Sequence, residues 1–196
     1  MSGEHMWNIL MDPLPYDWNG YPIDTDFQTG IQISQCLEDK DLSKREKLYT
    51  ALELLFPDED NRPPFNEAQE ALNWYMTEFN HDKHIKKNSD KKLMDFDVDQ
   101  WRIYAAFLRQ YHIDLNSAQM HWFVFMGLLS NLEESSFSRV IDIRQKEIKG
   151  KMSREEKNSL KEAKKVYALS SAEEPLTEEE KEKQAEALEA FNRMRK

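Results

Sequence analysis

The sequence predicts a mainly α-helical fold, a bundle of seven to eight helices with a small N-terminal β-hairpin. Apolar residues recur three and four positions apart along most of the 196 residues, which is the spacing of a helix face. Ser43, Ser153 and Thr177 are each followed three residues later by Glu, the pattern of a helix-opening capping box. Only 5 glycines and 7 prolines occur, fewer than turn-rich β-sandwiches use.

The hairpin is expected near the start of the chain. The segments Tyr16-Asp17-Trp18 and Tyr21-Pro22-Ile23 flank Asn19-Gly20. This pair suits a two-residue turn in which both residues need positive φ. Pro22 has no N–H to donate, so its strand is expected at an edge.

Three helices are expected next. Asp26 precedes the first, Ser43 caps the second, and Asn66 is expected to cap the third. The second should end before Pro57. The apolar stripes of these helices are Phe27, Ile31 and Leu37, then Leu48, Leu52 and Leu55, and then Ala68, Leu72, Tyr75 and Phe79.

Residues 80–96 are polar and lysine-rich without periodicity, which predicts a mobile loop. A fourth helix is expected to open at Asp97, with Gln100 completing its cap. A fifth follows in residues 120–132, which are apolar on every side from 122 to 129 except at Gly127, so it should be central. The expected stripes of the fourth, sixth and seventh helices are Val98, Trp101, Tyr104, Leu108 and Tyr111, then Phe137, Val140, Ile141 and Ile148 up to Gly150, and then Leu160, Ala163, Val166 and Tyr167.

The aromatic residues of the fourth and fifth helices could form either a core or a ligand-stacking platform. Because these helices are strongly periodic or wholly apolar, core packing is the preferred interpretation. The residues concerned are Trp101, Tyr104, Trp122, Phe123 and Phe125.

The end of the chain differs from the rest. Residues 170–175 are expected to link a last, highly charged helix, whose short apolar stripe is Leu188, Phe191 and Met194. The stripe could pack on its own core or on a partner, and we predict partner binding or self-association. The chain is thus divided into a hairpin and helical lobe (6–80), a linker loop (81–96), a second helical lobe (97–170), and a link with terminal helix (171–196).

No arrangement of residues predicts catalysis, a cofactor or a metal site. His81 and His84 have metal-ligand spacing, but no further ligands stand near them in the sequence. Asp95, Asp97 and Asp99 alternate as in a weak metal motif, yet helix capping explains them better. His112 and His121 are expected to be satisfied polar residues. Acidic neighbours should raise the pKa of the Cys36 thiol, which argues against a nucleophile.

Charge and composition limit the possible locations and partners. The net charge is −10, and the first 143 residues hold 25 acidic against 13 basic side chains, so nucleic-acid binding is not expected. Residues 144–165 reverse this with nine Lys and Arg against four Glu, which a solvated helix face or a basic binding face would explain. No apolar run is long enough for a membrane span or a secretion signal, and one cysteine fits a reducing cytoplasm. Residues 1–5 resemble a cloning scar, which makes Met6 the expected native start.

Seven short segments, taken in order and spacing over about residues 6–170, resemble the bacteriophage gene-product-fifteen family of long-tailed phages and prophages of Gram-positive bacteria. The segments are Asn8-Ile9-Leu10, residues 21–27 (Tyr-Pro-Ile-Asp-Thr-Asp-Phe), residues 51–57 (Ala-Leu-Glu-Leu-Leu-Phe-Pro), residues 105–108 (Ala-Ala-Phe-Leu), residues 111–115 (Tyr-His-Ile-Asp-Leu), His121-Trp122, and residues 165–169 (Lys-Val-Tyr-Ala-Leu).

The family's genes usually lie between those for the major tail protein and the tape-measure protein, a position that resembles that of tail assembly chaperones. The resemblance therefore implies a non-enzymatic assembly factor in the host cytoplasm, which binds tape-measure or tail-tube protein and can form homo-oligomers. It supplies no functional residues. The alternatives are a structural tail protein retained in the virion and a small phage regulator that binds a host protein or nucleic acid. The sequence leaves the oligomeric state open.

Overall fold

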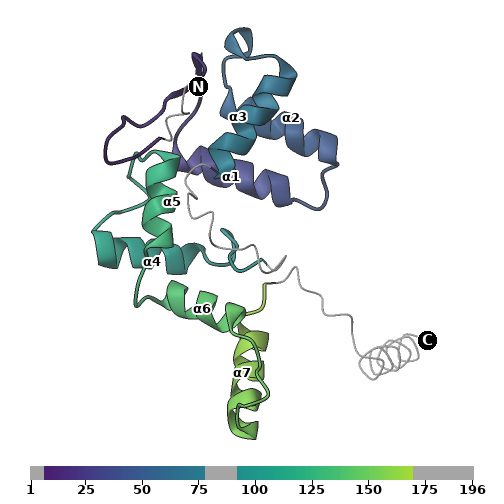
Figure 1. The fold of residues 1–196 in the computed structure, drawn as a ribbon, viewed down its shortest axis with the longest axis vertical. Coiled ribbons are helices and arrows are strands. Elements are labelled where there is room, and N and C mark those ends of the chain that lie inside the picture. The colour runs from purple at the N-terminus through teal and green to yellow at the C-terminus, as the bar shows by residue number, and fades with distance from the viewer. Residues whose placement is uncertain (1–6, 78–91, 170–196) are drawn as a thin grey trace, which may run out of the picture. The chain divides into compact units, whose positions relative to one another are not determined.

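A computed structural model describes residues 7–77 and 92–169 of the chain (Figure 1). Within these residues the structure has seven α-helices, one short 3-10 helix and one two-stranded antiparallel hairpin, which confirms the predicted fold class. The elements are β1 (Asp17–Trp18), β2 (Tyr21–Pro22), α1 (Phe27–Glu38), α2 (Lys44–Leu55), η1 (Glu59–Asn61), α3 (Phe65–Thr77), α4 (Gln100–Tyr111), α5 (Trp122–Ser130), α6 (Ser136–Gln145) and α7 (Arg154–Val166).

The described residues fall into two compact units. The large unit contains residues 7–77 and 95–139, and the small unit contains residues 92–94 and 140–169. None of the described helices is both long and apolar enough to cross a membrane.

The hairpin turns at the residues that the sequence indicated. Asn19 and Gly20 have φ of 51° and 88°, and Trp18 pairs with Tyr21 across the turn. Asp17 fixes the turn, because its Oδ1 accepts a hydrogen bond from the Gly20 N–H at 2.9 Å. The predicted positive-φ turn is confirmed.

Most helix starts follow local capping chemistry. Ser43 and Ser153 form complete capping boxes, and the Asp26 carboxylate accepts the Gln28 N–H at 2.8 Å. The cap predicted at Asn66 is wrong, because α3 begins at Phe65 and the Pro64 carbonyl already accepts the Ala68 N–H.

The prediction that the fourth helix starts at Asp97 is also wrong. The Asp95 carboxylate accepts the N–H groups of both Asp97 and Val98 at 2.9 Å, so these residues form a turn before the helix. Asp99 then stands at the N-cap of α4, with its side chain fully buried and 3.1 Å from the Arg102 guanidinium.

The core of the large unit is built around α5, as its apolar sequence predicts. Trp122 is only 1% exposed, and its indole N–H donates to the Tyr75 carbonyl on α3 at 3.2 Å. Its ring lies against the α1 backbone at Gly30, where a Cβ would overlap the indole. The absence of a side chain at Gly30 thus allows α1 and α5 to approach, and the prediction that Trp122 is a core residue is confirmed.

Helix α4 buries a different face from the one predicted. Ile103, Ala106 and Phe107 are buried, whereas Trp101 is 74% exposed. The Phe107 ring stacks on Phe125 with centroids 5.2 Å apart, which fixes the rotation of the helix. Apolar residues occupy two faces of α4, so their spacing alone could not show which face meets the core, and the prediction of Trp101 as a core residue is wrong.

The small unit packs the second half of α6 beside α7. Arg144 is only 4% exposed, and it donates from Nε to the Tyr167 carbonyl at 2.7 Å and from Nη1 to the Leu93 carbonyl at 2.9 Å. Its own carbonyl accepts the Lys164 ammonium at 2.9 Å. Helix α6 ends at Gln145, so the prediction that it runs through Ile148 is wrong.

Candidate functional site

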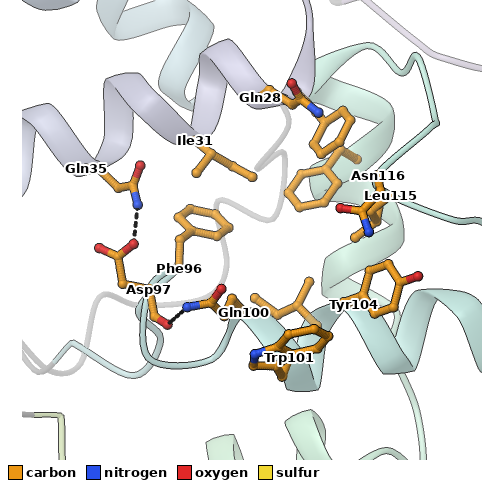
Figure 2. A pocket seen from close by; sticks show the side chains of 13 residues that line it. Gln28, Ile31, Gln35, Phe96, Asp97, Gln100, Trp101, Tyr104, Leu115 and Asn116 are labelled. Carbon is orange, nitrogen blue, oxygen red and sulfur yellow. Dashed lines mark hydrogen bonds between the residues drawn. The ribbon is translucent and has the colours of Figure 1, made fainter.

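A solvent-open pocket of about 390 Å³ lies within the large unit, between α1 and α4 (Figure 2). Helix α1 supplies four lining residues and α4 another four. The turn before α4, the segment after it and one residue of α5 complete the wall. The lining residues are Phe27, Gln28, Ile31, Gln35, Phe96, Asp97, Gln100, Trp101, Ile103, Tyr104, Leu115, Asn116 and Phe125.

The floor of the pocket is part of the protein core. Phe27 and Phe125 are buried and stack with ring centroids 4.9 Å apart, and Ile103 is also buried. Phe125 also stacks on Phe107, with ring centroids 5.2 Å apart, so neighbouring rings hold it in place. The apolar surface at the bottom is therefore formed before any ligand binds.

The mouth of the pocket presents aromatic side chains to solvent. Trp101 and Tyr104 lie one helical turn apart on α4 and meet edge to face, with centroids 6.0 Å apart. Figure 2 shows Trp101 across the opening from Ile31 of α1. An exposed Trp beside a preformed apolar floor is the residue type that most often anchors a protein interface.

Amide side chains supply most of the polar rim. Gln35 donates from Nε2 to the Asp97 carboxylate at 2.6 Å, and Gln100 donates to the Asp97 carbonyl at 2.8 Å (Figure 2). Gln28 and Asn116 complete the set of amides. Amides offer both donors and acceptors to an incoming backbone or side chain.

Asp97 and Tyr104 are the acidic side chains of the lining. The pKa of the Tyr104 hydroxyl is raised by desolvation and by its hydrogen bond to Asp114, which disfavours the phenolate. Apolar and aromatic side chains form most of the lining. The arrangement is suited to binding an apolar group.

A second exposed apolar feature lies at the start of the large unit. Leu10 is 87% exposed at the tip of a turn, flanked by exposed Ile9 and Met11. The turn is held by Asn8, whose side chain accepts the Leu10 N–H at 2.9 Å and whose carbonyl accepts the N–H groups of Met11 and Asp12. These side chains are thus displayed by an ordered backbone.

The structure describes only some of the candidate residues named from sequence. Leu188, Phe191 and Met194, with the last helix, and His81 and His84, with most of the loop of residues 80–96, lie outside the described residues. Trp101 and Tyr104 line the pocket although they were expected in the core. The signal that could have identified them was the second apolar face of α4.

Two further candidates, His121 and Cys36, have structural partners. His121 caps α5: its Nδ1 accepts the Phe123 N–H at 3.0 Å and its Nε2 donates to the Pro15 carbonyl at 2.7 Å. Burial and then Asp39 raise the pKa of Cys36, the expected direction. Among residues 7–77 and 92–169, no group of three or more His, Cys, Asp or Glu could hold a metal ion.

Neither a curated protein nor a solved structure matches the chain. A family model, described as bacteriophage Gp15 protein, matches residues 10–169, which is most of the chain. The match includes every helix of the described structure and all the residues of the pocket. The chain therefore belongs to the bacteriophage Gp15 protein family.

Proposed function

We propose that this phage protein is a tail assembly chaperone-like factor that binds the tape-measure or tail-tube protein through apolar helix faces, without catalysing a reaction. The observation that carries the proposal is the preformed apolar pocket between α1 and α4, with Trp101 exposed at its mouth. The usual position of the family's genes, beside the tape-measure gene, supports the choice of this partner.

The physical argument for this function is that the pocket exposes apolar surface to which a client can bind. A chaperone must cover apolar helix faces of its client before the client assembles, and such faces bind in grooves through spaced anchors. The pocket has a fixed aromatic floor, an exposed Trp and an amide rim, all of which suit this task. Isolated apolar residues are common on any surface, but an exposed Trp beside an open pocket is not.

The test is co-expression of this protein with the tape-measure protein of the same phage or prophage. An affinity tag on this chain should retain the tape-measure protein, and it should retain less of it when Trp101 is changed to Ala. Val166→Ser is the matched control, because Val166 is also 74% exposed but lies on α7 and does not line the pocket. If neither tape-measure nor tail-tube protein co-purifies with the unmodified chain, the proposal fails.

Mass spectrometry of purified virions separates this proposal from the alternative of a structural tail protein. An assembly chaperone should be absent from mature particles and present in the cytoplasm of the infected host. Detection at a stoichiometry similar to that of tail proteins would favour the structural alternative.

A further inference from the structure

We propose that the pocket between α1 and α4 receives the apolar face of an amphipathic helix whose flanks are basic, supplied by a partner protein. The inference rests on the proposed function and specifies the chemistry of the client segment. It follows from the shape of the pocket, the residues at its mouth and the charge of the large unit.

The shape favours a helix as the ligand. The pocket runs between two helices, and on α1 its wall includes Phe27, Ile31 and Gln35, which are four residues apart and follow one side of that helix. No strand contributes to the lining, so the site offers no sheet edge to an extended peptide. Grooves between helices take up amphipathic helices through residues spaced three and four positions apart.

The size indicates how much of the helix enters. Pockets that enclose whole small ligands have about 300–1,000 Å³, and this one lies near the lower limit at about 390 Å³. It can therefore hold one or two large side chains while the rest of the helix stays on the rim. Aromatic or long aliphatic residues fit a floor made of Phe27, Ile103 and Phe125.

The rim selects the flanks of the incoming helix. Asp97 is the one carboxylate among the lining residues, and none of them is Lys, Arg or His. Its Oδ1 is held by Gln35 at 2.6 Å, and a carboxylate can accept further hydrogen bonds. A Lys or Arg beside the apolar anchor would meet a group of opposite charge there.

The charge of the whole large unit also favours a basic ligand. Its described residues carry 20 Asp and Glu against 8 Lys and Arg. Such a field attracts a basic segment and repels an acidic one, which includes a second copy of the same unit. The occupant we infer is therefore a basic amphipathic helix, and the proposed function assigns that helix to another protein.

The probe is a fluorescein-labelled, covalently stapled peptide helix with Leu, Phe and Leu at positions i, i+4 and i+7 and Lys at its remaining outer positions. Two control peptides replace the Lys residues with Glu, or the three apolar residues with Ser. Fluorescence anisotropy with the full chain should show binding of the first peptide and at least about tenfold weaker binding of both controls.

Variants of the protein test whether the peptide binds at the pocket. Trp101→Ala should raise the Kd for the basic peptide about tenfold or more, because an exposed Trp is lost without disturbing the core. Asp97→Asn keeps an oxygen that can accept from Gln35 and should raise the Kd about two- to fivefold, an effect that added salt removes. Val166→Ser should leave the Kd unchanged.

Several results would overturn the inference. Equal binding of the Lys and Glu peptides would remove the charge argument, and an unchanged Kd in Trp101→Ala would move the site elsewhere. The basic peptide could fail to bind while sedimentation velocity shows a dimer that becomes a monomer in Trp101→Ala. That result would show that a second copy of this chain occupies the pocket. If a peptide of residues 177–196 binds and the basic peptide does not, the occupant of the pocket is a segment of this chain.

The outcome is separable from that of the proposed function. If the tape-measure protein co-purifies equally well with the unmodified chain and with Trp101→Ala, the function stands and the pocket inference fails. If no tail protein co-purifies but the basic peptide binds at the pocket, the site stands and the client must be sought among other proteins.

Discussion

At the scale of single residues, Trp122 shows how one buried aromatic side chain joins three helices. It belongs to α5, lies against the backbone of α1 at Gly30, and donates its indole N–H to Tyr75 on α3. Removal of this side chain would leave both an empty volume and a buried carbonyl without its donor. Trp101, by contrast, is exposed to solvent.

We predict that Trp122→Ala lowers the free energy of unfolding by about 3–5 kcal/mol, as large-to-small changes in a core do. Urea denaturation followed by circular dichroism measures the loss. Trp101→Ala is the control and should cost less than about 0.5 kcal/mol, because that side chain is exposed. A stable Trp122→Ala protein that had lost only its partner would reverse the assignment.

His121 provides a pH-dependent contact. Burial lowers the pKa of its imidazole, although the hydrogen bond to the Pro15 carbonyl opposes this shift. The neutral ring caps α5 through Nδ1, and a proton at Nδ1 would remove the acceptor for the Phe123 N–H. Between the lowered pKa and the ordinary value of about 6.5, the unfolded chain binds more protons than the folded one, so stability falls as the pH falls.

We therefore predict that the melting temperature decreases as the pH is lowered from about 7 through the region below 6.5. His121→Asn should have a smaller decrease over this range, since an amide oxygen can cap the helix and does not titrate. The measurement is differential scanning calorimetry at closely spaced pH values. Identical pH profiles for the two proteins would show that His121 does not carry the effect.

At the scale of elements, the small unit depends on one buried cation. Arg144 of α6 donates to the carbonyls of Leu93 and Tyr167, which belong to segments far from it in the sequence. Its fork of donors reaches both at once, as the single ammonium of a lysine cannot. Arg144 thus joins residues 92–94, α6 and the end of α7.

We predict that Arg144→Lys, which keeps the charge, destabilises the small unit by about 1.5–3 kcal/mol through the loss of one charge-assisted hydrogen bond. Hydrogen exchange should show this as faster exchange in α7, with α1 and α5 of the large unit much less affected. Arg154→Lys is the control, since Arg154 is exposed at the start of α7. Equal exchange rates in the Arg144→Lys and unmodified proteins would contradict the role given to Arg144.

The C-terminal residues carry a prediction made from sequence alone. The stripe Leu188, Phe191 and Met194 is short, and a helix with so little apolar surface gains little from packing. We predict that truncation after Leu169 leaves the rest of the chain folded but changes its oligomeric state or its affinity for the tape-measure protein. Circular dichroism measures whether the truncated chain is folded, and light scattering measures its oligomeric state.

A full-length variant with Ser at all three stripe positions is the control for the truncation, and it should behave in the same way. If the truncated chain unfolds, the stripe belongs to a core. If neither the oligomeric state nor the affinity changes, the stripe has no binding role.

At the scale of the whole molecule, charge is divided between the two units. The described residues of the large unit have 20 acidic against 8 basic side chains, whereas those of the small unit have 5 against 10. A basic unit of this size could contact phosphate, but the chain as a whole carries −10. Long-range repulsion from the large unit should oppose association with a polyanion.

We predict that the protein passes through a heparin column without retention at physiological salt. Retention to moderate salt would favour the alternative of a nucleic-acid-binding regulator. In that event Lys161→Glu with Lys165→Glu, two exposed positions of α7, should abolish retention. Lys44→Glu on α2 is the matched exposed control.

The amino-acid sequence by itself determined the features that depend on near neighbours in the chain. The turn at Asn19-Gly20 and the caps at Ser43 and Ser153 require only a few consecutive residues, and all three appear in the structure. The central place of α5 was also predictable, because a helix that is apolar all round has no face for water. The family followed from short segments in a fixed order.

Only the tertiary structure decided which face of α4 meets the core. That choice depends on a partner distant in sequence, Phe125, against which Phe107 packs. A helix with two apolar faces has nearly the same periodicity whichever face is buried, so the spacing could not place Trp101 at the surface. The pocket exists because packing fixed that choice, and it could not be derived from local pattern.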